Sequence, residues 1–205
     1  MSWHNDQVSE LETEKIMMIA SHCLAVEGDY VEMGCYKGDT SLALADLLDK
    51  SQKLACGKDV ENSALKRLWI YDSFEGLPEK TSQDVSPLGE NFKGGELYVT
   101  KREVKERFLR AGLKVPIIKK AWFNELTRED LPGKIAFAFL DGDFYESIRD
   151  SLRLVGSYMS RGGVVIIHDY NNEALPGVAK AVDEWLDKNK KIETEICQSM
   201  ILLHF

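Results

Sequence analysis

Four side chains of types that bind metal ions or carry protons follow two apolar runs of the sequence. Asp141 and Asp143 follow one run, and His168 and Asp169 follow the next. If the two runs are neighbouring parallel strands, their carboxyl ends meet at one edge of a sheet, where ligands bind in such folds. Clustered carboxylates repel one another unless they are protonated or bridged by a cation, and oxygen ligands suit a hard ion such as Mg²⁺. The pattern favours a divalent-metal site.

A glycine turn near the N-terminus lies where a cofactor would bind. The residues Gly34 to Gly38, GCYKG, follow a short apolar run and precede a helical pattern. The turn lacks the GxGxxG spacing that brings a backbone close to a pyrophosphate, since Cys35 and Tyr36 occupy its interior. A cofactor without phosphates needs fewer glycines, and the N-terminus of the following helix can receive its carboxylate. S-adenosylmethionine meets this description because it carries a carboxylate, an ammonium group and a sulfonium.

Further positions have the chemistry to hold such a cofactor. Glu32, inside the first strand, could bind the ammonium group directly or through water, with an ordinary salt bridge as the competing interpretation. Asp72, at the end of the second strand, is placed to accept hydrogen bonds from ribose hydroxyls or to cap a turn. Trp122 and Phe123 follow the predicted strand 115–118, where an aromatic ring could cover adenine, cover a substrate ring or pack in the core.

Alternating strands and helices must position these residues. The strand patterns lie at 30–33, 68–71, 115–118, 134–140, 164–167, 192–196 and 200–205. The helical patterns lie at 10–26, 40–48, 101–111, 145–159 and 177–189, with a polar connection over 51–63 and a Gly162-Gly163 turn before the fifth strand. The last two strands are joined by a link that permits a hairpin but no helical crossover. We therefore predict one α/β domain over 1–205, with a doubly wound, mainly parallel, seven-stranded sheet and a C-terminal antiparallel hairpin.

Residues 73–98 form a long irregular segment rich in Gly, Pro, Ser and charged residues. Such a segment in a compact domain is usually functional or mobile. We predict that it is an active-site lid and that it selects the substrate.

The composition argues against several classes of partner. The chain has 205 residues, 44% of them hydrophobic, which suffices for one core and leaves little room for a second domain. The formal net charge of −8 argues against nucleic-acid binding. The longest apolar run, 135–140, is far below the roughly 20 residues that a membrane span needs. The first residues lack the pattern of a secretory signal, so we expect a cytoplasmic protein. The apolar N-terminal helix and Trp69 would suit a homodimer without establishing one.

Several motifs, taken in order, resemble the macrocin O-methyltransferase family. They are VEMGCYKGDTS (31–41), YDSFEGLP (71–78), LDGDFYES (140–147), GGVVIIHDY (162–170) and PGVAKAV (176–182). The resemblance spans about residues 29–185 and implies a class I, Rossmann-like methyltransferase fold. It also implies methyl transfer from S-adenosylmethionine to a hydroxyl of a sugar or of a glycosylated small molecule, with a catechol-like phenol as the main alternative acceptor.

The resemblance also implies roles for individual residues. Asp141 would be a metal ligand and the general base, and Asp169 a second ligand. The family typically has two aspartates before the tyrosine, whereas this chain has His168 and Asp169. Three outcomes stay open for His168: it ligates the metal and favours Mn²⁺ or another transition metal, it acts as a base, or the site has lost its metal. The expected cofactor contacts are Glu32, Gly34, Cys35, Tyr36, Gly38, Thr40, Ser41, Asp72, Ser73, Phe74, Trp122 and Gly142.

Two functions from other classes compete with this interpretation. A nicotinamide-dependent oxidoreductase is disfavoured by the missing GxGxxG pattern and by the predicted C-terminal hairpin. A non-catalytic protein that binds S-adenosylmethionine without metal chemistry stays open because of His168.

Overall fold

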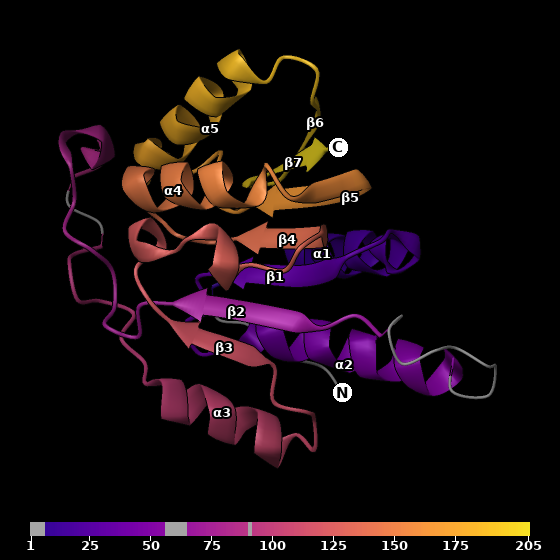
Figure 1. Ribbon diagram of the computed structural model, residues 1–205. Coiled ribbons are helices and arrows are strands. Elements are labelled where there is room, and N and C mark those ends of the chain that lie inside the picture. Colours follow the sequence, from indigo (N-terminus) through magenta and orange to yellow (C-terminus); the bar gives the residue numbers. More distant parts are fainter. Residues whose placement is uncertain (1–6, 56–64, 90–91) are drawn as a thin grey trace.

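Within residues 7–55, 65–89 and 92–205, which the computed structural model describes, seven strands form one mixed sheet in the order β3-β2-β1-β4-β5-β7-β6 (Figure 1). The strands are β1 (Asp29–Met33), β2 (Leu68–Asp72), β3 (Ile117–Lys120), β4 (Ile135–Leu140), β5 (Met159–Ile167), β6 (Glu193–Cys197) and β7 (Met200–His204). The first five pair in parallel, and β7 runs antiparallel to both β5 and β6. The predicted fold, with its C-terminal hairpin, is confirmed.

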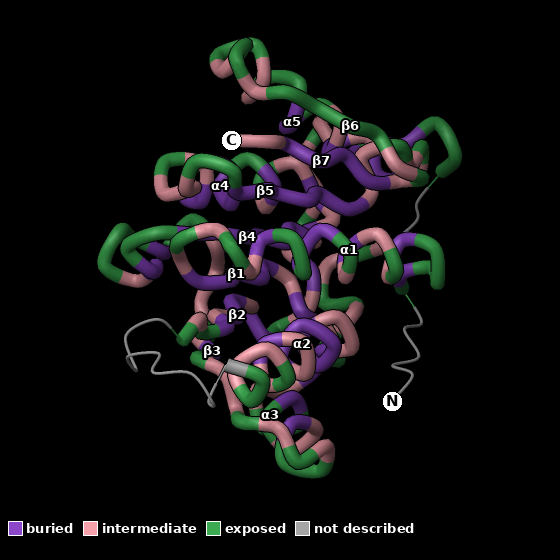
Figure 2. Tube along the Cα trace, turned by 90° about the vertical axis from the view of Figure 1, so that its right-hand side faces the viewer, coloured by how far each residue is buried: buried purple, intermediate pink, exposed green. Residues whose placement is uncertain are grey.

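Helices cover both faces of the sheet. They are α1 (Glu10–His22) with a 3₁₀ turn at Cys23–Ala25, α2 (Asp39–Ala55), α3 (Lys101–Arg110), α4 (Tyr145–Val155) and α5 (Pro176–Lys188). One apolar layer joins the sheet to α1, α2 and α3, and the other joins it to α4 and α5. The central strand β4 is therefore buried along its whole length, which explains its uninterrupted apolar sequence (Figure 2). Among the described residues, no helix is long and apolar enough to cross a bilayer.

The order of the central strands places the predicted site residues at one edge of the sheet. β4 lies between β1 and β5, so the segments after these three strands are neighbours. In Figure 1 the arrowheads of β1, β2 and β4 point the same way, towards the loops that carry the predicted site. The adjacency on which the predicted metal site depends is confirmed.

Several element boundaries differ from the sequence-based prediction. The strand expected at 115–118 is Ile117–Lys120, the helix expected at 145–159 ends at Val155, and the strand expected at 164–167 begins at Met159. The helix expected at 40–48 continues to Ala55, because its polar second half forms solvent-facing ion pairs that keep it helical, including Lys50–Asp46 at 2.6 Å. The first part of the predicted polar connection is thus helical, and residues 56–64 lie outside the described residues.

The Gly162-Gly163 pair was also assigned wrongly, as a turn before the fifth strand. Both glycines lie inside β5, where the pairing with β4 shifts register. Gly162 has a φ of +83° and its N–H donates to the carbonyl oxygen of Phe205 at 2.6 Å. A glycine at such an irregularity allows a strand to continue past a local kink, so the glycine pair does not mark the start of β5.

The predicted lid segment is fastened to the domain at several points. Its N-terminal part pairs with its C-terminal part, since the Leu77 N–H donates to the Glu96 carbonyl oxygen at 2.8 Å. Between them, the Asp84 carboxylate accepts the N–H of Tyr145 at 2.7 Å, at the first turn of α4. The Ser86 hydroxyl donates to the carbonyl oxygen of Glu173 at 2.7 Å, in the loop before α5. These contacts hold the described part of the segment beside the carboxyl ends of the strands.

Leu152→Ala tests the packing of α4 onto the sheet. Leu152 is fully buried in the layer that joins α4 and α5 to β4 and β5, so its truncation should lower the free energy of unfolding by about 3 kcal/mol. Urea unfolding followed by circular dichroism measures this loss. The control Leu109→Ala, at a side chain of α3 that is 66% exposed, should change the free energy by less than about 0.5 kcal/mol. Equal losses in the two variants would contradict the layer assignment.

Candidate active site

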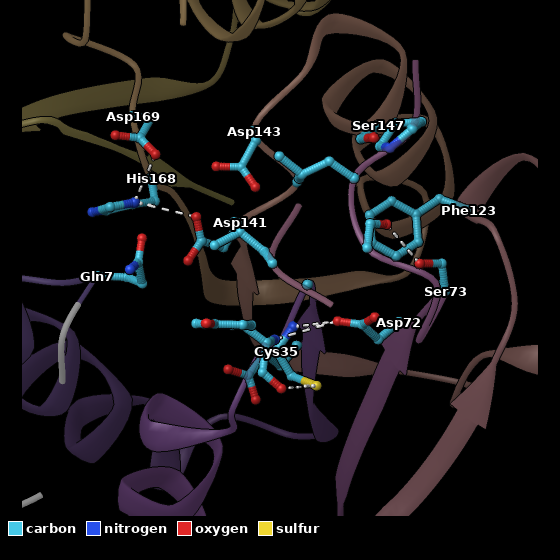
Figure 3. Close-up of a pocket in the computed structure, with 18 of the residues that line it drawn as sticks. Gln7, Cys35, Asp72, Ser73, Phe123, Asp141, Asp143, Ser147, His168 and Asp169 are labelled. Carbon is cyan, nitrogen blue, oxygen red and sulfur yellow. Dashed lines mark hydrogen bonds and ion pairs between the residues drawn. The ribbon is translucent and has the colours of Figure 1, made fainter. Parts of the chain in front are cut away.

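A cavity of about 470 Å³ opens at the carboxyl ends of β1, β2, β4 and β5 (Figure 3). The predicted site residues that line it are Glu32, Gly34, Cys35, Tyr36, Thr40, Asp72, Ser73, Trp122, Asp141, Gly142, His168 and Asp169. Gly38, Ser41 and Phe74 are not among the lining residues, and all three are buried. The structure therefore brings most of the predicted residues to one cavity of a size typical for small-molecule sites.

Close contact between two strand ends explains the first glycine of the turn. Gly34 has a φ of +87°, and a side chain there would place its Cβ 1.9 Å from the backbone oxygen of Asp141. The Gly34 N–H donates to the Tyr71 carbonyl oxygen at 3.0 Å, which holds the start of the turn between β2 and β4. Only glycine combines this dihedral angle with this approach.

The Asp72 carboxylate fastens the glycine turn to the end of β2. Its Oδ2 accepts the N–H of Cys35 at 2.9 Å and that of Tyr36 at 3.3 Å, and its Oδ1 accepts the N–H of Phe74 at 2.7 Å. The turn-capping role that the sequence left open is thus present. Because carboxylate oxygens can accept further hydrogen bonds and Asp72 also lines the cavity, its role towards a ribose stays a prediction.

Glu32 is a buried carboxyl in the cavity wall, with an exposed fraction of 1%. The Ser41 hydroxyl donates a hydrogen bond to its Oε2. Burial, together with the charges of Asp141 and Asp72, raises the pKa of Glu32 to about 8 against the opposing effect of this hydrogen bond. A cationic group in the cavity would stabilise the ionised form of Glu32, because it would compensate the free-energy cost of a buried negative charge.

Asp141, His168 and Asp169 form a cluster of potential metal ligands (Figure 3). The Nδ1 atom of His168 lies 3.2 Å from Oδ1 of Asp141 and 3.0 Å from Oδ2 of Asp169. Backbone hydrogen bonds fix the two strand ends, from Asp141 to the Met33 oxygen at 2.8 Å and from His168 to the Leu140 oxygen at 3.0 Å. Adjacent ligands of an octahedral ion with bonds of about 2.1 Å lie about 3.0 Å apart, so the donor set fits a divalent cation.

The pKa values of His168, in the cluster, and of the nearby Asp143 are both strongly raised. Burial alone lowers the pKa of the His168 imidazole, but the Asp141 carboxylate and the contact with Asp169 outweigh it and raise this pKa well above its usual value. Burial raises the pKa of the Asp143 carboxyl, and the charges of Asp141 and Asp169 raise it further. Protons therefore balance part of the negative charge at this end of the cavity, and a bound cation would displace them.

Some cavity residues were missing from the sequence-based set. Phe123 packs beside Gly142, where an added Cβ would lie 3.3 Å from its ring, although the prediction assigned the cofactor contact to Trp122. Asp143 and the segment 73–98, singled out in the sequence without a cofactor contact, also contribute to the lining, the latter through Gly76, Leu77, Pro78, Phe92 and Leu97. The lining residues that the sequence did not predict are Gln7, Val8, Lys37, Asp39, Ala121, Asn124, Glu125, Glu146, Ser147, Asp150 and Asn172. For Gln7 and Val8, the nearest sequence signal is the capping pattern from Ser9 to Glu12. This pattern marks where α1 begins but does not place the preceding segment near the cavity.

Glu32→Gln tests the buried carboxyl through pH. The folded-state pKa of about 8 lies above the ordinary value of 4.5, so the protonated carboxyl stabilises the fold at low pH, and this contribution is lost as the pH rises towards 8. Urea unfolding between about pH 5 and pH 9 should show the wild type losing stability relative to the Gln variant as the pH rises. Glu14→Gln, on the exposed side of α1, is the matched control. Parallel pH profiles of the wild type and Glu32→Gln would refute the assignment.

The chain is similar in sequence to O-methyltransferases from two bacteria. The chain is 32% identical over 155 residues to the 8-demethyl-8-(2,3-dimethoxy-alpha-L-rhamnosyl)-tetracenomycin-C 4'-O-methyltransferase of Streptomyces olivaceus, covering 73% of this chain and 55% of that protein. It is 27% identical over 168 residues to the demethyldecarbamoylnovobiocin O-methyltransferase of Streptomyces niveus, covering 80% and 60%. The chain thus spans between 55% and 60% of the length of these two curated relatives.

Solved structures agree on the fold. The O-methyltransferase NovP superposes with a TM-score of 0.77 at 25% identity, covering 94% of this chain and 78% of that one. The calicheamicin methyltransferase CalS11 superposes with a TM-score of 0.71 at 18% identity, over 94% and 78%, and supports the fold alone. Residues 11–200 match the family model described as Macrocin-O-methyltransferase (TylF), which includes the glycine turn and all three residues of the metal-ligand cluster. The chain belongs to the macrocin O-methyltransferase family.

Proposed function

We propose that this protein transfers a methyl group from S-adenosylmethionine to a hydroxyl group of a sugar on a glycosylated small molecule, assisted by a divalent cation. The observation that carries the proposal is one cavity in which the glycine turn of β1 adjoins the cluster of Asp141, His168 and Asp169. Methyl transfer requires the methyl carbon of the donor and the oxygen of the activated hydroxyl to lie close together, and a turn and a cluster in one cavity would allow this.

The chain offers a group for each part of the methyl donor. The glycine turn and the N-terminus of α2 would receive its carboxylate, and Glu32 its ammonium group. Asp72 would accept hydrogen bonds from the ribose, while Phe123 beside Gly142 would cover the adenine. When bound, S-adenosylmethionine supplies a methyl group on a sulfonium, and in-line attack by the acceptor oxygen breaks the carbon–sulfur bond and leaves the electron pair on sulfur.

Asp141, His168 and Asp169 would hold the cation next to the methyl donor. A divalent cation at this position would lower the pKa of a coordinated hydroxyl and fix its orientation. The Asp141 carboxylate would take the proton that the hydroxyl loses as its bond to the methyl carbon forms. The cluster would thus stabilise the negative charge that develops on the acceptor oxygen and remove its proton. A sugar hydroxyl needs both effects because it is a weak nucleophile at neutral pH.

The mixed character of the cavity supports a sugar as acceptor. Its wall combines carboxyl groups such as Asp143 with apolar side chains of the predicted lid, including Leu77, Phe92 and Leu97. A sugar ring presents hydroxyl groups at its edge and apolar C–H groups on its faces, so both kinds of side chain find partners. The names of the two curated relatives describe O-methylation of a rhamnosyl-tetracenomycin and of a novobiocin precursor. Glycosylated natural products of this kind are the acceptors we propose to test.

Asp141→Asn is the variant that tests the proposed function most directly. Calorimetric titration of the metal-stripped protein should show S-adenosylhomocysteine binding in the wild type and in the variant. Mn²⁺ or Mg²⁺ binding should weaken at least about tenfold in the variant, because one charged ligand is lost. Transfer of a radiolabelled methyl group to a rhamnosylated tetracenomycin should fall at least about 100-fold.

Glu106→Gln, on the outer face of α3, is the control and should leave all three measurements unchanged. Absence of S-adenosylhomocysteine binding in the wild type would refute the proposed cofactor. Cofactor binding without any metal affinity would refute the metal-assisted mechanism and favour a non-catalytic binding protein or a metal-independent enzyme.

A further inference from the structure

Glu12 is a helix-capping residue with an unusual position. α1 begins with a capping box in which Oε2 of Glu12 accepts the N–H of Ser9 at 3.1 Å and its hydroxyl at 2.6 Å. α3 begins with the same arrangement, made by Thr100 and Glu103, and there the glutamate is exposed. Glu12 instead is 6% exposed. Because a cap needs no burial, the burial of Glu12 calls for further contacts that compensate its charge.

Those contacts join three distant parts of the chain. Oε1 of Glu12 accepts the N–H of Ser199 at 3.1 Å and its hydroxyl at 2.5 Å, in the turn between β6 and β7. The Ser199 carbonyl oxygen accepts the N–H of Asn171 at 3.0 Å, in the loop that follows β5. Oε2 of Glu12 lies 3.7 Å from Nε2 of His168, at ion-pair distance. The carboxylate is therefore held from two sides and faces the imidazole.

The two nitrogens of His168 consequently face different partners. Nε2 faces Glu12, whereas Nδ1 faces Asp141 and Asp169, the other members of the ligand cluster. A neutral imidazole has one N–H and one lone pair, and an ionised carboxylate can only accept. Without a cation, the nearer carboxylates of Asp141 and Asp169 also favour a proton on Nδ1. When a cation takes the place of that proton, Glu12 favours keeping the remaining proton on Nε2, which leaves the lone pair of Nδ1 for the ion between the two aspartates. Metal-binding histidines are commonly held in this way by a carboxylate on the opposite nitrogen.

We propose that Glu12 is a positioning residue that makes Nδ1 of His168 a metal ligand, and that the resulting set of one nitrogen and two carboxylate donors takes a first-row transition ion such as Mn²⁺ in preference to Mg²⁺. The proposal rests on the divalent-cation site of the proposed function. Imidazole suits transition ions, whereas Mg²⁺ is bound chiefly by oxygen, so the nitrogen donor sets the preference.

A double-mutant cycle on the full-length protein tests the proposal. Mn²⁺ binding, measured by electron paramagnetic resonance of the free ion, should weaken about tenfold or more in Glu12→Gln. In the His168→Asp background the ligand is a carboxylate that has no tautomer, so Glu12→Gln should cause no weakening there. His168→Asp by itself should reduce the ratio of Mn²⁺ to Mg²⁺ affinity.

Thr100→Ala is the matched control for the capping role. It removes the corresponding hydroxyl of the α3 capping box, whose Glu103 is exposed, so it should lower stability by about 1 kcal/mol without changing Mn²⁺ affinity. A second readout is ¹⁵N nuclear magnetic resonance of the protein loaded with diamagnetic Zn²⁺. His168 should show a protonated Nε2 and a metal-bound Nδ1.

The outcomes separate the two proposals. If the wild type binds neither Mn²⁺ nor Mg²⁺, the metal site of the proposed function fails, and this inference fails with it. If the wild type binds Mn²⁺ but Glu12→Gln has no effect, or weakens binding equally in both backgrounds, Glu12 is only structural and the inference alone is refuted. A Zn²⁺ complex in which Nε2 is the metal-bound nitrogen would also refute it.

Discussion

The close approach of β1 and β4 at their carboxyl ends is the constraint on which the site depends. The Asp141 N–H donates to the Met33 carbonyl oxygen at 2.8 Å, and Gly34 passes so near that a Cβ would lie 1.9 Å from the Asp141 oxygen. This contact ties the cofactor turn to the strand that carries the first proposed ligand. Because β5 pairs with the other side of β4, His168 and Asp169 reach the same place. The turn proposed for the methyl donor and the cluster proposed for the cation thus line one cavity.

Negative charge at this edge of the sheet has a cost. Glu32, Asp141, Asp143 and Asp169 all face the cavity, and buried or crowded carboxylates are unfavourable unless they are paired. The structure compensates part of this cost with protons held on Glu32 and Asp143 and with the imidazole of His168. The remaining compensation would come from the ligands, because a cation in the cluster and an ammonium group at Glu32 both bring positive charge. Binding would then stabilise the fold by an amount that grows with the logarithm of the ligand concentration.

Much of this arrangement could be predicted from the sequence because it depends on local patterns. The carboxylates and the histidine directly follow apolar strands, and the final two strands are joined too closely for a crossover. The hydrophobic pattern and the length of the connections therefore sufficed to predict the sheet and the edge at which these residues lie. The continuation of α2 beyond its apolar half depends on ion pairs such as Lys50–Asp46, which the hydrophobic pattern does not record. Gly162 lies inside β5, where the pairing with β4 shifts register. In the sequence, a glycine pair is equally typical of a turn, so this position could not be assigned from the pattern.

Long-range packing explains the contacts that the sequence did not reveal. The capping box of α1 is a local pattern, but the burial of Glu12 arises only when the turn at Ser199 and the loop at His168 close around it. Glu12 precedes both His168 and Ser199 by more than 150 residues in the sequence, and no periodicity links them. Phe123 and Trp122 are adjacent aromatic residues, so only the packing beside Gly142 distinguishes them. Tertiary contacts of this kind decide which polar groups act together.

The most direct measurement of the central claim is X-ray diffraction at the manganese absorption edge, from crystals grown with S-adenosylhomocysteine and Mn²⁺. The account predicts an anomalous peak within about 2.1–2.3 Å of a carboxylate oxygen of Asp141, Nδ1 of His168 and a carboxylate oxygen of Asp169. S-adenosylhomocysteine should occupy the glycine turn, with its sulfur facing the ion across the space for an acceptor hydroxyl. Two results would contradict the account. In one, S-adenosylhomocysteine occupies the glycine turn but no anomalous peak lies at the cluster; in the other, an ion is bound but His168 is turned away from it.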